Sequence, residues 1–109
     1  MRVYLSGPMS GYPESNYPRF NWLAMRLRLK GHEVMNPAEF DGGVQGYSWY
    51  YYLSRDLSML VWRRLTGRLD ALVLHGRWWE STGAKLETMI AVCLRMRVLP
   101  VQELLDHEE

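Results

Sequence analysis

The chain has 109 residues, 48% of them hydrophobic, which suits one compact domain spanning residues 1–109. Thirteen basic and twelve acidic residues leave a net charge of +1, so no basic excess indicates a duplex nucleic-acid partner. A single cysteine, Cys93, excludes an intramolecular disulfide, and its place on an apolar helical stripe predicts a buried structural thiol rather than a nucleophile.

The first segment, MRVYLSGPMSG, contains one arginine and a short apolar run. It fits neither a signal peptide nor a membrane span, so we expect a cytoplasmic protein that makes no membrane contact. Residues 3–5 predict a buried strand that runs into a turn at residues 6–8. The glycines of this turn do not form a phosphate-binding loop of the G-x-x-x-x-G-K type, because no lysine follows them.

A helix is predicted next, beginning in residues 15–18 and ending near Gly31. Its buried face follows helical spacing through Phe20, Leu23, Ala24 and Leu27. Residues 33–37 predict a second strand, and residues 38–48 are expected to form a loop.

Helical spacing returns from residue 49 to residue 65, with an apolar side made of Leu53, Leu57, Leu60, Val61 and Leu65. Residues 69–74 read as the clearest strand. A helix over residues 82–96 and a strand over residues 98–101 follow, and the acidic tail from residue 103 is expected to fray.

The predicted order is β-α-β-α-β-α-β, which favours a small doubly wound parallel sheet of about four strands with helices on both faces. Ligands of such sheets bind at the carboxyl ends of the strands. The segments expected there are residues 6–11, Asn36-Pro37 and residues 75–83. His75 ends the central strand, where it either lines the site or has a hydrogen-bonded structural role, and no histidine spacing indicates a metal site.

The start of the helix predicted over residues 82–96 offers an anion site. Ser81 or Thr82 can cap the helix, and Gly83 lets a ligand approach the free N–H groups of its first turn. Because capping serines are common, the same residues are equally explained as a plain helix cap.

Two carboxylates lie on the flanks of predicted helical stripes. Glu87 borders a stripe made of Leu86, Met89, Ile90, Cys93 and Met96, and its side chain leans back toward the strand ends. Asp56 borders the stripe of the preceding helix. The pair either converges on one cleft, as glycosyl chemistry requires, or consists of a solvated glutamate and an aspartate paired with Arg55 or Arg63.

Aromatic residues gather in two short segments, residues 47–52 and Trp78-Trp79. Such clusters form a subunit interface, the walls of a ligand site, or both.

The motifs Tyr4-Leu5-Ser6-Gly7-Pro8, Asn36-Pro37, Arg55-Asp56 and Ser81-Thr82-Gly83-Ala84-Lys85-Leu86-Glu87 together resemble one superfamily. It is the nucleoside 2-deoxyribosyltransferase-like proteins, which include nucleoside 5′-monophosphate N-glycosidases, and the resemblance spans residues 3 to about 100. It implies that Glu87 attacks the anomeric carbon of the sugar, that Asp56 orients the nucleoside and that Tyr4 positions the nucleophile. It also implies homo-oligomers, a small nucleoside or nucleotide as partner, and no cofactor or metal.

Ser81 separates the branches of this superfamily. The transferases tend to carry an aspartate six residues before the nucleophile, whereas the monophosphate hydrolases carry a phosphate-binding serine, so a 5′-monophosphate is the expected ligand. The hydrolases also hold the phosphate with a serine and an arginine where this chain has Pro8 and Ser10, which leaves Arg77 as the candidate cation. The expected substrate contacts are Ser6, Gly7, Pro8, Ser10, Gly11, Asn36, Arg77, Ser81 and Gly83.

The expected activity is therefore hydrolysis of the base–sugar bond of a (deoxy)nucleoside 5′-monophosphate. Two alternatives stay open at this point, a nucleotide-binding module without turnover and a transferase that exchanges bases on nucleosides.

Overall fold

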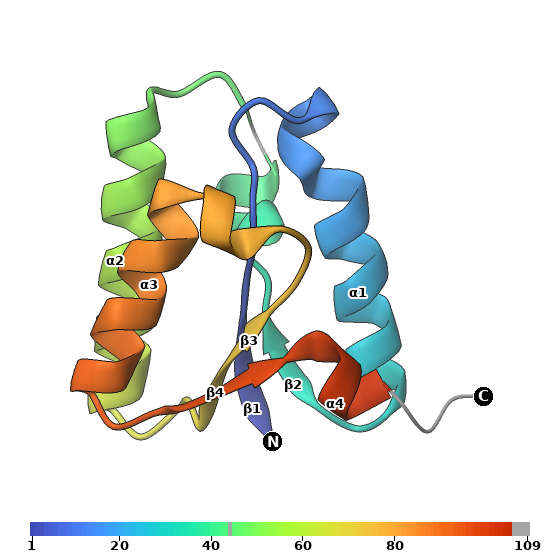
Figure 1. Ribbon diagram of the computed structural model, residues 1–109, viewed down its shortest axis with the longest axis vertical. Coiled ribbons are helices and arrows are strands. Elements are labelled where there is room, and N and C mark those ends of the chain that lie inside the picture. Colours follow the sequence, from blue (N-terminus) through green and yellow to red (C-terminus); the bar gives the residue numbers. More distant parts are fainter. Residues whose placement is uncertain (44, 106–109) are drawn as a thin grey trace.

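The computed structural model describes residues 1–43 and 45–105 and contains one parallel sheet of four strands in the order β2-β1-β3-β4. Figure 1 shows the sheet in the middle of the molecule with helices on either side. Its strands are β1 (Arg2–Ser6), β2 (Glu33–Met35), β3 (Ala71–Leu74) and β4 (Arg97–Pro100). The predicted fold class is confirmed.

The helices form one layer on each face of the sheet (Figure 1). One layer holds α1 (Tyr17–Leu29) and the short α4 (Val101–Leu105), and the other holds α2 (Trp49–Leu65) and α3 (Thr82–Cys93). Three 3₁₀ segments join these elements: η1 (Pro13–Asn16), η2 (Pro37–Gly43) and η3 (Trp78–Glu80).

Alternate side chains of the central strands point into the two hydrophobic cores, one on each face of the sheet. Val3 and Leu5 of β1 face α1, whose buried residues are Tyr17, Phe20, Leu23, Ala24 and Leu27. Tyr4 of β1 faces the opposite layer together with Leu60 of α2 and Ala91 of α3. The period of two along β1 thus assigns each residue to one core.

The chain leaves β1 and β3 in opposite directions, because α1 crosses one face of the sheet toward β2 and α3 crosses the other toward β4. The turns after β1 and β3 therefore separate and open a space at the carboxyl ends of these strands. Gly7 is required in the first turn, since a Cβ there would lie 2.4 Å from Nε2 of the buried His75.

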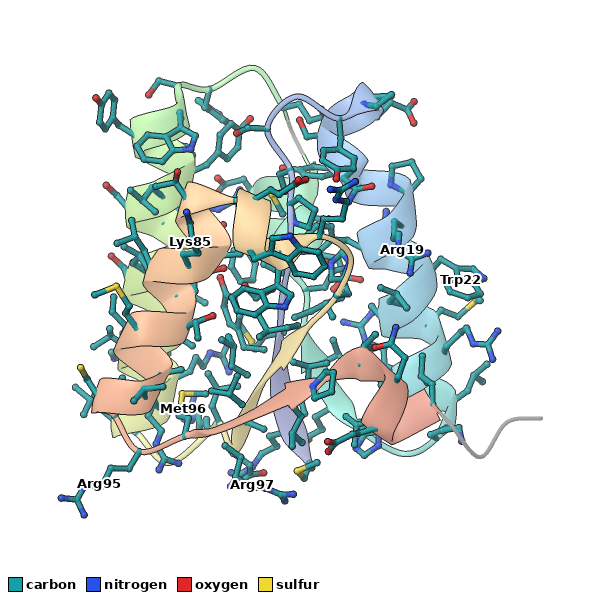
Figure 2. The ribbon with its side chains drawn as sticks, viewed as in Figure 1. Arg19, Trp22, Lys85, Arg95, Met96 and Arg97 are labelled. Carbon is teal, nitrogen blue, oxygen red and sulfur yellow. The ribbon has the colours of Figure 1, made fainter. Side chains whose placement is uncertain are left out.

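The predicted bounds of α2 are confirmed, and those of α3 are too long at the end. Arg95 adopts a left-handed φ of 58°, which stops the helix, and the chain turns Met96 into the core. Figure 2 shows Arg95 pointing outward and Met96 lying inside the layer. The last strand begins at Arg97, and Val101 starts α4 rather than ending the strand. The tail predicted to fray lies outside the described residues from residue 106 onward.

The predicted apolar stripe of α3 is right only in part, since Ile90 and Met96 pack in the core but Met89 and Cys93 do not. The face turned to the sheet carries Ala84, Glu87 and Ala91, because small side chains allow close packing there. Met89 is 64% exposed and Cys93 is also exposed, so the prediction of a buried structural thiol is wrong. Leu65 at the end of α2 is 71% exposed, since it lies beyond the part of the helix that faces the core.

Candidate active site

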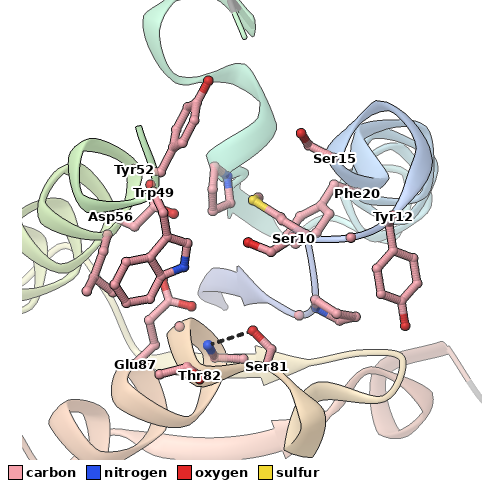
Figure 3. Close-up of a pocket in the computed structure, with 18 of the residues that line it drawn as sticks. Ser10, Tyr12, Ser15, Phe20, Trp49, Tyr52, Asp56, Ser81, Thr82 and Glu87 are labelled. Atoms are coloured by element: carbon pink, nitrogen blue, oxygen red, sulfur yellow. Dashed lines mark hydrogen bonds between the residues drawn. The ribbon is translucent and has the colours of Figure 1, made fainter. Parts of the chain in front are cut away.

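A cavity of about 650 Å³ opens at the carboxyl ends of β1 and β3, a volume typical of small-ligand sites. Its lining comes from the turn after β1, the start of α1, the first turns of α2 and the junction of η3 with α3. Figure 3 shows these four segments facing one another across the cavity.

Glu87 reaches the cavity from the buried face of α3 and is 6% exposed. The Ser6 hydroxyl donates a hydrogen bond of 2.6 Å to Oε1, whereas Oε2 is buried without a hydrogen-bond partner. Burial, followed by the nearby Asp56 charge, raises the pKa of Glu87 to about 8, against the opposing effects of Ser6, Tyr4 and Arg55. Figure 3 shows the carboxylate pointing into the cavity below Trp49 and Asp56.

Asp56 reaches the same cavity from α2 and forms an ion pair with its neighbour Arg55, with Nε and Oδ1 2.9 Å apart. Burial raises the pKa of Asp56 to about 6, although the Arg55 charge and hydrogen bond lower it. The structure therefore combines two alternatives for Asp56 that the sequence leaves open: it is paired with Arg55, and it converges with Glu87 on one cavity.

Arg55 belongs to this site, and the sequence does not predict how its side chain is held. Its guanidinium lies between the rings of Phe40 and Tyr52, 5.1 and 5.0 Å from their centroids, and donates to the Pro37 carbonyl at 3.1 Å. These contacts fix the cation beside Asp56. An arginine next to a candidate aspartate is the sequence signal for this arrangement, but the aromatic stacking depends on the tertiary structure.

Tyr4 lies fully buried below the two carboxylates, and its hydroxyl donates to the Asp56 carbonyl at 3.3 Å. Burial and the Glu87 charge raise the pKa of Tyr4 well above its usual range, so this phenol stays protonated. It links the start of the sheet to α2 without lining the cavity.

The N-terminus of α3 forms one wall of the cavity. Ser81 is the N-cap residue, and its Oγ accepts from the Ala84 amide at 3.1 Å. Ser81, Thr82 and Gly83 all line the cavity, so the first N–H groups of the helix lie at its surface. The charged side chains in the described lining are Asp56, Glu80 and Glu87, and no lysine or arginine is among them.

The predicted contact residues fall into two groups. Gly7, Pro8, Ser10, Gly11, Ser81 and Gly83 line the cavity. Ser6 lies behind it, bonded to Glu87, and Asn36 and Arg77 do not line it.

Asn36 and Arg77 have partners elsewhere. The Asn36 amide donates to Asn21 Oδ1 at 2.9 Å and its carbonyl oxygen accepts from the Ala38 amide, which shapes the turn after β2. Arg77 is exposed and forms an ion pair with Glu80 at 2.8 Å. Its charge is therefore already paired, although the sequence predicts it as the cation for a phosphate.

Aromatic side chains form much of the opposite wall. Tyr47, just before α2, lines the cavity together with Trp49 and Tyr52 of that helix. Tyr12, just before η1, and Tyr17, the first residue of α1, also line it. Of the two uses predicted for the aromatic segment 47–52, the structure supports a ligand-site wall for these three members.

His75 lies beneath the turn after β1 and does not line the cavity. Its ring meets Phe20 edge-on, with centroids 4.4 Å apart, and burial lowers its pKa to about 4. This histidine is therefore neutral, and its packing role differs from the two roles that the sequence leaves open.

In residues 1–43 and 45–105 no cluster of three or more candidate ligand side chains is arranged to hold a metal ion. No helix in this part of the chain has the length and apolar character needed to cross a membrane.

Comparison with protein families gives a match over almost the whole chain. The family described as "Domain of unknown function (DUF4406)" matches residues 1–100. The chain belongs to this family. No curated protein matches the sequence of this DUF4406 chain significantly.

The DUF4406 fold has a counterpart among solved structures. It is similar to a structure titled "2-desoxiribosyltransferase from Leishmania mexicana", with a TM-score of 0.61 and 19% identity over 91% of this chain. The DUF4406 chain spans 62% of the length of that protein. The predicted nucleoside 2-deoxyribosyltransferase-like fold is therefore confirmed.

Proposed function

We propose that this DUF4406 chain hydrolyses the N-glycosidic bond of a nucleoside 5′-monophosphate, with Glu87 as the nucleophile. One observation carries the proposal: Glu87 ends in a cavity of ligand size, with Oε1 bonded to Ser6 and Oε2 without a partner. A buried carboxylate that keeps one oxygen unbonded at a cavity is suited to attack an electrophilic carbon.

The reaction proceeds in two displacements. An electron pair of Oε2 forms a bond to the anomeric carbon, while the bond from that carbon to the base breaks and its electrons leave with the base. The departing base takes up a proton, and Asp56, which lines the same cavity, is the candidate donor. Because the pKa of Glu87 is about 8 and that of Asp56 about 6, the step draws on the form of the pair in which Glu87 is ionised and the proton lies on Asp56. Water then attacks the same carbon, loses a proton to Asp56, and frees the Glu87 carboxylate.

The N-terminus of α3 supports a 5′-phosphate as part of the substrate. Ser81 to Gly83 bring helix N–H groups to the cavity, where the partial positive charge of the helix end favours an anion. The described lining contains no lysine or arginine, so these N–H groups would bind the phosphate without help from a cationic side chain.

The acidic lining also favours a second candidate, base exchange on an unphosphorylated nucleoside. The lining has three carboxyl groups and no lysine or arginine. Two of the carboxylates are already paired with arginines, so neither arginine is left to meet a phosphate, and a neutral ligand suits the cavity better. The similar solved structure carries the name of a 2-desoxiribosyltransferase, which agrees with that chemistry. Binding of a nucleotide without turnover is a third outcome that the experiment must separate.

The test incubates the protein with a panel of nucleosides, deoxynucleosides and their 5′-monophosphates, with and without an acceptor base, and measures free and exchanged base by liquid chromatography. We expect base release from 5′-monophosphates without an acceptor, abolished in Glu87→Gln and retained in Glu80→Gln, whose carboxylate also lines the cavity. Release only with an acceptor would favour the transferase. Nucleotide binding without any release would leave a binding module.

A further inference from the structure

Ser6 is the last residue of β1 and is 1% exposed. It pairs with Leu74 of β3 in parallel register, and its carbonyl accepts from the His75 amide at 3.0 Å. Pairing with β3 therefore fixes the backbone that carries the Ser6 side chain.

The hydroxyl of Ser6 ends at Glu87. Oγ donates to Oε1 at 2.6 Å, a short bond typical of a hydroxyl that donates to a carboxylate. The terminal torsion of a glutamate is otherwise broad, so this short bond restricts how the carboxylate plane is turned. It occupies Oε1 and leaves Oε2 unbonded.

Ser6 does not line the cavity, unlike Ser10 four residues later. The sequence predicts that Ser6 contacts the substrate directly. In the structure Ser6 instead contacts Glu87, the candidate nucleophile.

We infer that Ser6 is a positioning residue, whose hydroxyl holds Oε1 of Glu87 so that Oε2 is the oxygen that attacks the sugar. The inference rests on the proposed function. In the first displacement the bond to Ser6 orients the attacking oxygen. In the glycosyl ester Oε1 becomes the carbonyl oxygen and keeps accepting from Ser6. When water displaces the ester, the same hydrogen bond stabilises the charge that returns to the carboxylate.

The first test does not depend on activity. The protein is labelled with ¹³C at the glutamate carboxyl groups, and the Glu87 resonance, assigned by its loss in Glu87→Gln, is followed by NMR from pH 4 to pH 10. Since Ser6 donates to the ionised form, Ser6→Ala is expected to raise the pKa of Glu87 by about one unit. Ser6→Thr keeps the hydroxyl and is expected to stay near wild type, as is the matched control Ser10→Ala.

The second test measures kinetics on the best substrate of the panel. Ser6→Ala is expected to lower kcat roughly tenfold with little change in KM, because the bond orients the nucleophile rather than the substrate. Ser6→Thr is expected to restore most of the rate. A higher KM with unchanged kcat would make Ser6 a substrate contact and overturn the inference.

The two tests also separate the inference from the proposed function. An unchanged Glu87 titration in folded Ser6→Ala would overturn the role of Ser6 even if the wild-type protein releases base. Absence of base release by the wild type would overturn the proposed function, whereas the titration would still report whether Ser6 holds Glu87.

Discussion

Two carboxylates define the candidate site at the scale of single residues. Glu87 and Asp56 are both removed from water, and each has a raised pKa because burial disfavours its charged form. Arg55 is directly paired with Asp56, whereas the neutral hydroxyl of Ser6 donates to Glu87. The pair is thus unequal: Asp56 ionises first, and its charge then opposes ionisation of Glu87.

Glu87 makes the stability of the protein depend on pH. Its pKa of about 8 in the folded state exceeds the ordinary value of 4.5, so the folded state binds the proton more tightly than the unfolded state. Stability from this group is fully present below pH 4.5 and is lost as the pH rises through 8. Glutamine does not ionise, so Glu87→Gln is expected to remove this loss of stability at high pH. We expect the variant to exceed wild type by on the order of 3 kcal/mol at pH 9, with near equality at pH 4.5.

Thermal unfolding followed by circular dichroism between pH 4.5 and pH 9 measures this difference. Glu80→Gln is the matched control, because Glu80 lines the same cavity but is 51% exposed in its ion pair with Arg77. Its difference from wild type is expected to stay small at every pH. A gap between Glu87→Gln and wild type that does not change with pH would contradict the raised pKa.

The sequence predicts the identity of the central residues better than their contacts. Glu87 and Asp56 are recognisable from motif and helical position, and the structure brings both to one cavity. The bond of Ser6 to Glu87 joins residues 81 positions apart, which only folding brings together. The ion pair of Arg77 with Glu80 is local but depends on side-chain torsions. Residue type at the end of a strand or in a loop therefore does not tell a substrate contact from a positioning contact.

At the scale of elements, α3 connects the sheet to the cavity. Its inner face carries Ala84, Glu87 and Ala91, and the two alanines let the helix approach closely enough for Glu87 to reach Ser6. A pattern weighted toward large apolar residues instead adds Met89 and Cys93 to the buried stripe, although both are exposed. The spacing of two alanines around the glutamate is the signal that identifies the inner face.

Two helices offer matched tests of the anion site. Ser81 caps α3 at the cavity, and Ser48 caps α2 with an Oγ that accepts from the Tyr51 amide at 3.2 Å but does not line the cavity. Either serine replaced by alanine is expected to lose about 1 kcal/mol of stability, measured by urea unfolding. Only Ser81→Ala is expected to raise KM for a 5′-monophosphate, by roughly tenfold, because it alone alters the phosphate-facing turn.

The comparison isolates ligand binding from helix stability. Equal KM values for Ser81→Ala, Ser48→Ala and wild type would show that Ser81 serves only as a cap. A rise in KM in both variants would trace the effect to general loosening of the two helices.

At the scale of the whole molecule, strand order creates the site. β1 and β3 are neighbours in the sheet but send their chains to opposite faces, so four segments distant in sequence converge at one edge. The alternation of apolar strands and amphipathic helices predicts this topology, since parallel strands need covered crossovers. It does not predict which aromatic side chains near the start of α2 line the cavity, since that depends on how this helix is placed beside the sheet.

The same arrangement leaves an apolar surface on the layer of α2 and α3. Met89 and Val92 of α3 are 64% and 61% exposed, and residues 89–94 contain no charged side chain. On α1 the exposed Trp22 is instead flanked by Arg19 and Arg26, whose guanidinium carbons lie 5.9 and 4.7 Å from its ring centroid. Figure 2 shows Arg19 and Trp22 projecting outward from α1. Uncharged apolar surface is the kind that association buries.

We therefore expect the protein to form homo-oligomers through the outer face of α3. Sedimentation velocity over a hundredfold range of concentration is expected to show a dimer or larger species for wild type. Val92→Glu places a charge in that face and is expected to yield monomers, whereas Met25→Glu on α1, at a residue 51% exposed, is expected to leave association unchanged. A wild type that stays monomeric at every concentration would contradict the expectation. Dissociation by Met25→Glu alone would move the interface to α1.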